Sequence, residues 1–415
     1  MHPSRLERTG TASRLRPLQS AFSDYIHTLH ARREKQITDM KIIVAMDSYK
    51  GCLSSDEAGR AVAHTLEAVC PYAEIVCLPV SDGGEGLAQA LLRAVGGREE
   101  TADVHDPLMR RITAAYTVLP DGTAVIDMAS ACGLPLLREH ERNPLHTTTY
   151  GFGEMLRDAV RKGCRNIIAG LGGSATNDCG TGMMQALGTR FYGRDGREIP
   201  LMCGGELDTV ERLDIADLYH LTAGITFTAA CDVDTPLLGS RGATMTFAPQ
   251  KGASAADLLT LENGMTRFAR VLGRHTARTD FAGKAGSGAA GGLGAAMYAV
   301  LNAQLKPGAE IVLDAVNFDK LATGAHLIIT GEGHSDLQTL MGKLPYRIMK
   351  RAERHSLPAL LVSGAVDNES ALLASGFRAV RAVTPQGQPL EEAMKPENAR
   401  MNIKKTIYEL FLHMR

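Results

Sequence analysis

A glycine-rich segment at residues 170–182 contains the residues of this sequence best suited to bind an anion. It follows the apolar run 166–169 and precedes another apolar run, an order that predicts a strand, a turn and a helix. Glycine allows the backbone to approach a ligand closely, and free N–H groups at a helix start attract anions. Thr176 and Asn177 are candidate N-caps of that helix, and Asp178 adds a carboxylate. The segment therefore favours a phosphate site with either a metal or a hydroxyl to deprotonate; the alternative is a turn whose glycines serve packing only.

Three acids, Asp47, Asp82 and Glu332, stand at or just beyond the carboxyl ends of predicted parallel strands. In an open α/β sheet those ends line the ligand crevice. Converging carboxylates repel one another unless a cation lies among them, and Mg²⁺ needs only one or two carboxylates beside phosphate oxygens. We therefore predict a magnesium site there, with Lys50 and Lys343 as phosphate contacts. The alternative for each acid is a helix cap or a solvated loop residue, and for each lysine an exposed side chain.

Asp232 and Asp234 alternate on one face of a predicted strand. They indicate either a second metal or substrate-hydroxyl site, or the ordinary polar end of a strand. Arg241 and Lys251 are candidates for binding a substrate carboxylate, which Arg can do with two parallel hydrogen bonds. Cys179 lies inside the glycine-rich segment and is predicted to be a bystander rather than a reactive thiol.

Two generic nucleotide signatures give a mixed result. The sequence has no G-x-x-x-x-G-K-[ST] segment, which excludes a P-loop nucleotidase. Residues 170–175 match the dinucleotide pattern G-x-G-x-x-[GA]. The acid required about 20 residues later should end a strand, yet Asp195 lies in a polar turn. An NAD(P)-dependent hydroxy-acid oxidoreductase is therefore kept as an alternative.

The elements that must position these residues follow a βα rhythm early and late in the chain. Strands are expected at 41–46, 74–80, 229–234, 243–247, 326–330, 358–362 and 377–380, a hairpin around 120–122, and helices at 54–70, 86–94 and 150–162. We infer that the early and late units share one parallel sheet. The predicted fold is a Rossmann-like α/β domain at 40–99 and 301–415, with a second α/β domain inserted at 100–300. Residues 283–294 suit either a flexible crossing or close helix packing.

Composition bounds the class of protein. The 415 residues are 44% hydrophobic and 22% charged, which is typical of a globular protein, and the length favours two domains. The net charge of −1 gives no reason to expect binding to nucleic acid or to a membrane. The eight cysteines include no C-x-x-C pair, which argues against a structural zinc site. The sequence shows no secretory signal, so we expect a reducing, cytoplasmic compartment. Residues 1–39 are Arg-rich and unlike the rest; we expect them to lie outside the fold with Met40 as the start, the alternative being a mitochondrial presequence.

From Met40 nearly to the C-terminus, the sequence resembles the type-1 glycerate kinases. The resemblance rests on separated segments in the right order, at residues 47–51, 82–86, 170–178, 230–234, 249–252, 289–294 and 330–333. It implies ATP-dependent phosphorylation of D-glycerate, usually to 2-phosphoglycerate, and a Rossmann-like domain with a second α/β domain inserted. Met46, Cys179, His334 and Arg347 depart from the family pattern.

The resemblance and the residues together give a mechanistic hypothesis in which ATP, Mg²⁺ and glycerate meet in a cleft between the two domains. Asp178 is the expected base, with Asp47 as the alternative, and Lys50 assists catalysis. The other expected roles are phosphate binding by Gly83, Gly84, Gly172, Gly173, Ser174, Asn177 and Lys343, metal binding by Asp82, Glu85 and Glu332, and substrate binding by Asp232, Asp234, Arg241 and Lys251. A homodimer is an open alternative to a monomer, and a non-catalytic nucleotide or metabolite sensor is an open alternative to a kinase.

Overall fold

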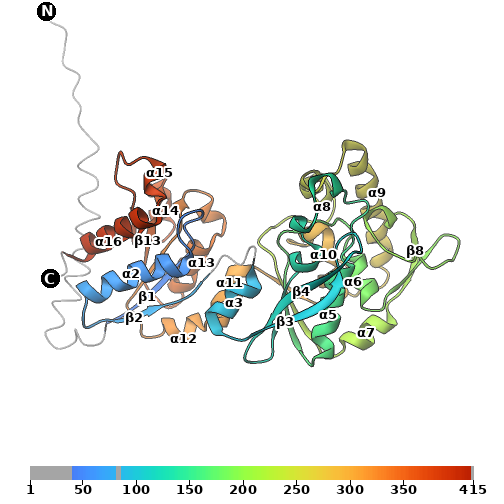
Figure 1. Cartoon of the computed structure of the whole chain (residues 1–415), viewed down its shortest axis with the longest axis horizontal. Coiled ribbons are helices and arrows are strands. Elements are labelled where there is room, and N and C mark those ends of the chain that lie inside the picture. The colour runs from blue at the N-terminus through green and yellow to red at the C-terminus, as the bar shows by residue number, and fades with distance from the viewer. Residues whose placement is uncertain (1–39, 81–85, 413–415) are drawn as a thin grey trace, which may run out of the picture. The chain divides into compact units, whose positions relative to one another are not determined.

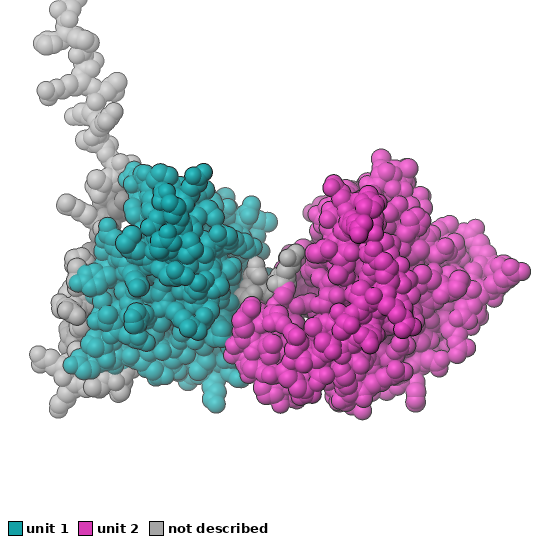
Figure 2. All heavy atoms as spheres, in the orientation of Figure 1, with its two compact units in different colours: residues 1–80, 316–415 teal, residues 81–315 magenta. Residues whose placement is uncertain are grey.

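The structure, a computed structural model, describes residues 40–80 and 86–412, which form two compact units (Figures 1 and 2). Unit 1 holds the described residues up to 80 and from 316 onward, and unit 2 holds those between. The fold is therefore α/β with one unit inserted into the sequence of the other. The predicted boundaries at 99/100 and 300/301 differ from this division. Helix α3 (Leu87–Val95) packs on strands of unit 2, and α11 (Gly308–Ala315) packs on α3, so both helices belong to unit 2.

Unit 1 is built on a parallel sheet of five strands in the order β15-β13-β11-β1-β2. Strand β1 pairs with β2 on one side and with β11 on the other, where Ile42 lies opposite Leu327 and Met46 opposite Gly331. The early and late strands thus share one sheet, as the sequence predicts. The strand bounds are Lys41–Met46 for β1, Glu74–Cys77 for β2, Leu327–Gly331 for β11, Ala359–Ser363 for β13 and Ala379–Ala382 for β15, with β12 (His334–Ser335) and β14 (Ala365–Val366) as a separate pair.

Helices cover the sheet of unit 1 because its strands are apolar on both faces. Ile42, Val44 and Met46 pack in one cluster with helices α2 and α16, while the intervening Ile43 is equally buried but points to the other face. The predicted capping box starts α2: Ser54 N donates to Glu57 Oε2 at 2.9 Å, and Glu57 N donates to Ser54 Oγ at 3.3 Å. The helices are α2 (Ser55–Val69), α12 (Phe318–Ala322), α13 (Leu344–Glu353), α14 (Glu369–Ala374), α15 (Leu390–Ala393) and α16 (Pro396–Leu412).

Unit 2 is built on a sheet of six strands in the order β10-β9-β6-β5-β4-β3. Strands β10, β9, β6 and β5 are parallel, and β4 and β3 continue the sheet in antiparallel fashion. The predicted hairpin joins β4 and β5. The bounds are Arg98–His105 for β3, Arg111–Val118 for β4, Ala124–Asp127 for β5, Asn166–Gly170 for β6, Thr226–Ala230 for β9 and Gln304–Lys306 for β10, with β7 (Arg190–Gly193) and β8 (Val210–Asp214) as a separate antiparallel pair.

Two predictions for unit 2 are wrong at the level of local structure. Residues 243–247 form helix α8 (Ala243–Phe247), in which Thr246 N donates to Gly242 O at 3.0 Å; five residues are too few to separate a strand period from one helical turn. The helix after the glycine-rich segment, α6 (Thr181–Ala186), is capped by Gly180 rather than by Thr176 or Asn177. The other helices are α4 (Ala129–Cys132), α5 (Tyr150–Arg161), α7 (Ala216–Thr222), α9 (Ala255–Leu272) and α10 (Ala289–Ala299).

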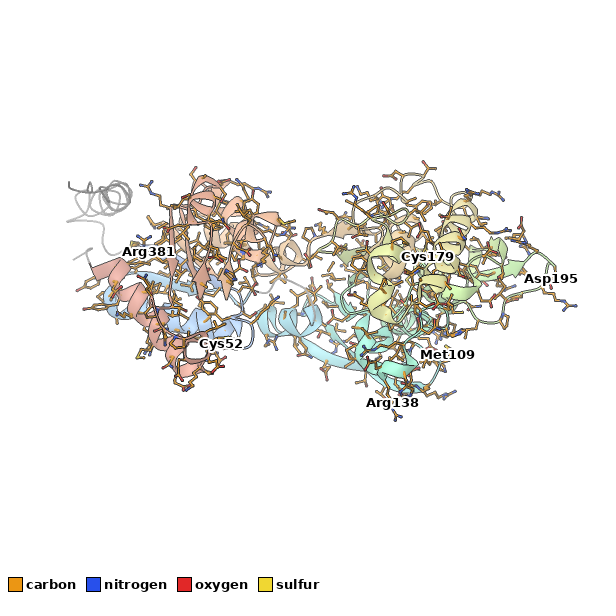
Figure 3. The ribbon with its side chains drawn as sticks, turned by 90° about the horizontal axis from the view of Figure 1, so that it is seen from above. Cys52, Met109, Arg138, Cys179, Asp195 and Arg381 are labelled. Carbon is orange, nitrogen blue, oxygen red and sulfur yellow. The ribbon has the colours of Figure 1, made fainter. Side chains whose placement is uncertain are left out.

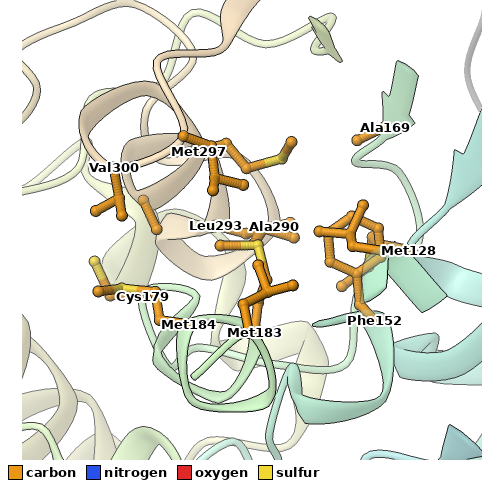
Figure 4. Packing of buried hydrophobic residues seen from close by; sticks show 14 of the residues in the cluster. Met128, Phe152, Ala169, Cys179, Met183, Met184, Ala290, Leu293, Met297 and Val300 are labelled. Carbon is orange, nitrogen blue, oxygen red and sulfur yellow. The ribbon is translucent and has the colours of Figure 1, made fainter. Parts of the chain in front are cut away.

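The glycine-rich segment at 283–294 packs closely against the other glycine-rich segment. Gly291 has φ +65°, and a Cβ on it would lie 2.1 Å from Thr176 O. Cys179 N donates to Gly291 O at 3.0 Å, and the Cys179 side chain packs with Leu293 and its neighbours in the buried core (Figure 4). Of the two interpretations of residues 283–294, the structure supports close packing.

Candidate active site

A cavity of about 640 Å³ opens in unit 2 at the carboxyl ends of β6 and β9. Gly170 and Ala230 are register partners at these ends, so the segments that follow the two strands leave the sheet at one edge. The cavity is lined by residues 171–174 and 230–233, by Leu134, Pro135 and Arg142, by Phe247, Gln250 and Lys251, and by Ala289 and Ala290. The tertiary structure thus brings Gly172, Gly173, Ser174, Asp232 and Lys251 together, as the sequence hypothesis requires of a binding site.

Lys251 places a cation in the cavity wall. It ends the 3-10 turn η5 (Pro249–Lys251) and is only 3% exposed. Its Nζ donates to Ser174 Oγ and to Thr176 O, each at 2.7 Å. Both acceptors are neutral, and burial lowers the pKa of Lys251 to about 7, against a smaller raising effect from Asp178. An anion in the cavity would supply the charge that these partners lack.

Arg142 is a second cation in the same wall. It follows the 3-10 turn η3 (Glu139–Glu141) and lines the cavity. Its Nε is buried and has no hydrogen-bond partner among the described residues. Buried donors are normally satisfied, so this atom indicates a site where a ligand acceptor belongs. The sequence prediction missed Arg142, because this residue does not follow the end of a predicted strand and belongs to no glycine-rich segment.

Asp232 is the carboxylate that lines the cavity within the part of the chain described here. It follows β9, and its Oδ1 accepts a hydrogen bond from Gly308 N at 3.0 Å. Its side chain is exposed. The cavity wall therefore combines two cationic side chains, one carboxylate, a serine hydroxyl and the backbone of two glycines.

Asp178, the expected base, is placed differently. It is fully buried, and its Oδ2 accepts from Thr149 N and Thr149 Oγ1 at 2.8 Å and from Gly182 N at 3.2 Å. Its Oδ1 accepts from Gly180 N at 3.2 Å. Burial raises the pKa of Asp178, partly offset by these hydrogen bonds. Asp178 does not line the cavity. In this structure the Asp178 carboxylate holds the glycine-rich segment in shape, and its expected role as the base stays a prediction.

A second set of predicted residues meets in unit 1, at the carboxyl ends of β1 and β11. Asp47 and Glu332 follow these neighbouring strands and are both buried, and Asp47 N donates to Gly331 O at 2.8 Å. Glu332 Oε1 accepts from Ser335 Oγ at 3.0 Å and from Thr339 Oγ1 at 2.6 Å. The prediction that these acids share one sheet edge is thus supported by the strand order.

The predicted phosphate contacts of unit 1 lie at the same edge. Lys343 Nζ forms an ion pair with Glu332 Oε2 at 3.3 Å, and Lys343 directly precedes α13. Lys50 lies in the turn after β1, where its backbone passes beside Gly333, and its side chain is exposed. Both lysines therefore stand where an anion at this edge would meet them.

The acids of unit 1 fit Mg²⁺ in kind and number. Asp47 and Glu332 are two buried carboxylates at adjoining strand ends, and Mg²⁺ commonly takes one or two carboxylates, with the remaining ligands from phosphate and water. Within residues 40–80 and 86–412, no three His, Cys, Asp or Glu side chains gather into a larger metal cage. The predicted metal ligands Asp82 and Glu85 and the predicted phosphate contacts Gly83 and Gly84 lie outside the described residues.

Three further predicted residues lie outside the wall of the unit 2 cavity. Asn177 is buried, and its Nδ2 donates to Thr244 Oγ1 at 3.1 Å. Asp234 and Arg241 are exposed. None of the three is among the described residues that line the cavity. Alternation with Asp232 is no guide at this point, because β9 ends at Ala230 and the segment beyond it is not a strand.

Two other expectations concern Asp195 and Cys179. Asp195 lies in an exposed turn directly after β7, where its Oδ1 accepts from Arg197 N at 3.0 Å, and Figure 3 shows it at the rim of the ribbon. It does not end a strand, as the acid of a dinucleotide site should. Cys179 is buried, and burial raises the pKa of its thiol, which agrees with a bystander.

Within the described residues, each helix is too short or too polar to cross a membrane.

Comparisons with known proteins agree with this architecture. Residues 42–415 match the glycerate kinase family. The chain is 42% identical to a glycerate kinase of Bacillus cereus over 88% of its own length and 96% of the relative's, and 40% identical to a glycerate 2-kinase of Escherichia coli over 86% and 93%. The crystal structure of a provisionally assigned glycerate kinase 2 from Salmonella typhimurium LT2 superposes with a TM-score of 0.78 at 40% identity, covering 90% of this chain and 97% of that one. The chain therefore belongs to the glycerate kinase family.

Proposed function

We propose that this protein transfers the terminal phosphoryl group of ATP to a hydroxyl group of D-glycerate and forms 2-phosphoglycerate. Membership of the family and the names of the relatives support glycerate as the acceptor, and the name of the Escherichia coli relative supports the 2-position. The observation that carries the proposal is the cavity of unit 2, which is lined by the buried Lys251 and by Arg142, whose Nε is buried. Among the described residues of the wall, no carboxylate is hydrogen-bonded to either cationic group.

The cavity is suited to the carboxylate of a small hydroxy acid. Lys251 supplies a point charge, and Arg142 supplies a planar group that can donate two parallel hydrogen bonds. Ser174 Oγ accepts from Lys251, which leaves its own proton to donate to a substrate oxygen. We propose that the hydroxyls of a substrate held by these groups face the part of the wall that includes Asp232.

Asp232 is proposed to orient the substrate hydroxyl and take its proton. It is the carboxylate of the described cavity wall, whereas Asp178 is closed off by four hydrogen bonds. Phosphoryl transfer depends mainly on positioning and on neutralising charge, so a hydroxyl held in line contributes more than a strong base. In this proposal Asp178 keeps the glycine-rich segment in the shape that presents Gly172, Gly173 and Ser174.

The nucleotide end of the reaction is proposed to use the strand ends of unit 1. Lys50 and Lys343 would bind phosphate oxygens, and Asp47 and Glu332 would hold Mg²⁺. The bound ion would neutralise the charge of the terminal phosphates. Glu332 is kept in place for this by Ser335 and Thr339. That the two units close on one pair of substrates stays a prediction from the sequence.

An ADP-release assay with D-glycerate, ATP and Mg²⁺ tests the proposal, and ³¹P NMR of the product against both phosphoglycerate standards tests the position. We expect turnover that requires all three components and yields the 2-phosphate. ATP binding without turnover would favour a sensor, and reduction of NAD(P)⁺ by a hydroxy acid would favour an oxidoreductase. Formation of the 3-phosphate would contradict the proposed position alone.

A further inference from the structure

Arg142 has a buried donor that the protein itself does not satisfy. Its Nε is buried without a hydrogen-bond partner among the described residues, and its side chain lines the cavity of unit 2. A buried N–H of a cation that makes no hydrogen bond is unfavourable and uncommon. The cost is offset if the functional state provides an acceptor, and in this cavity the acceptor would come from a ligand.

The backbone holds Arg142 against the segment that carries Lys251. Gly252 directly follows Lys251 and has φ +96°, in the left-handed region that favours glycine. A Cβ on Gly252 would lie 2.2 Å from Arg142 O and 3.0 Å from Arg142 Cβ. The absence of that atom lets the two segments touch. Two cations from segments far apart in the sequence therefore line one cavity.

The charges and the apolar wall select the kind of ligand. Lys251 donates to neutral oxygens, Ser174 Oγ and Thr176 O. Leu134, Pro135 and Phe247 form an apolar part of the same wall, which weakens the competition of water for these donors. A compact ammonium beside a planar guanidinium matches a carboxylate, whose two oxygens can each take one or two of these hydrogen bonds.

We infer that Arg142 determines substrate specificity in this protein by binding the carboxylate of a small hydroxy acid, and that Gly252 allows Arg142 to lie beside Lys251. This inference rests on the proposed function, because it names the group that recognises the acid substrate. It implies that the acid is distinguished from its uncharged amide mainly by Arg142. It also implies that the acid binds to the protein without nucleotide, because the cavity lies wholly within unit 2.

The test compares Arg142→Gln and Arg142→Lys with the control Arg138→Gln. Arg138 is an exposed arginine of the same loop region (Figure 3). It does not line the cavity. Loss of a charge-assisted hydrogen bond predicts a rise in KM for D-glycerate of about 10- to 100-fold in Arg142→Gln, with KM for ATP unchanged. Arg142→Lys should recover part of the loss, since it keeps the charge but not the planar fork. Arg138→Gln should behave as wild type.

Glyceramide, the uncharged amide of the substrate, separates recognition from a structural role. We expect Arg142→Gln to reduce the ratio of kcat/KM for D-glycerate to that for glyceramide by about 10-fold or more, whereas a loosened cavity would lower both values together. An unchanged ratio would overturn the inference. Calorimetric binding of D-glycerate without ATP gives a readout independent of turnover. If the wild type binds D-glycerate and Arg142→Gln binds it weakly, but neither phosphorylates it, then the proposed function fails and this inference stands.

Discussion

Substitution of Asp178 separates a structural from a chemical role for the acid at the centre of the glycine-rich segment. In Asp178→Ala, three buried backbone N–H groups, those of Thr149, Gly180 and Gly182, lose their acceptor. Each unsatisfied donor costs about 1–3 kcal/mol, so the variant should lose at least about 3 kcal/mol of unfolding free energy. In Asp178→Asn, the amide oxygen can keep the bonds of Oδ2, and only the Gly180 N–H meets another donor, which costs about 1–3 kcal/mol.

The assay combines urea unfolding with steady-state kinetics under conditions where each variant is folded. We expect the midpoint to fall in the order wild type, Asp178→Asn, Asp178→Ala, and kcat of folded Asp178→Asn to stay within about 10-fold of wild type, because the side chain does not meet the substrate. Asp195→Asn, in an exposed turn, is the matched control and should match wild type in both. Wild-type stability of Asp178→Asn with kcat reduced by about 100-fold or more would refute the reasoning and restore Asp178 as the base.

Three further predictions concern the cavity and the packing around it. Burial lowers the pKa of Lys251 to about 7. The KM for D-glycerate should therefore be constant below pH 7 and rise by up to about tenfold per pH unit above it, because the ammonium loses its proton. A pH profile of KM checks this, and Lys251→Met should have a high KM that does not depend on pH in this way. Asp232→Asn should lower kcat by about 100-fold or more with KM for ATP unchanged, as loss of general-base assistance predicts; near-normal kcat in the steady-state assay would remove Asp232 from the proton transfer. Gly291→Ala should destabilise the protein in urea unfolding by more than Gly224→Ala, whose positive φ costs about 1–2 kcal/mol alone, because a Cβ at Gly291 would also lie 2.1 Å from Thr176 O while nothing lies within 4 Å of one at Gly224.

Much of the fold follows from local patterns. The capping box at Ser54 starts α2 one residue later, and the apolar run before Asp47 is β1. These features act over a few residues, so the sequence displays them directly. Where the pattern is short the prediction is less secure: residues 243–247 are one turn of helix, and α6 begins at Thr181. Thr176 and Asn177 are the predicted N-caps of the helix that follows the glycine-rich segment, but the residue in the N-cap position of α6 is Gly180.

The candidate site was predictable in part because strand ends collect at sheet edges. This rule brings Asp47 to Glu332 in unit 1, and it brings Gly172 and Ser174 to Asp232 in unit 2. It does not tell which way a side chain faces. Asp178 and Ser174 belong to one glycine-rich segment, yet Ser174 lines the cavity and Asp178 does not.

The sequence by itself determined the α/β class, the insertion of one unit in the other, and the family. The reason is that strand and helix periodicity and the order of the family segments can be recognised without knowledge of tertiary contacts. The tertiary structure decided which residues meet. Lys251 is hydrogen-bonded to Ser174, which lies 77 residues away in the sequence, and Asp178 is hydrogen-bonded to Thr149, which lies 29 residues away. Arg142 enters the cavity because Gly252 lets its backbone come close. Contacts of this kind depend on packing between distant segments, and hydrogen-bond partners, burial and the resulting pKa values depend on them in turn.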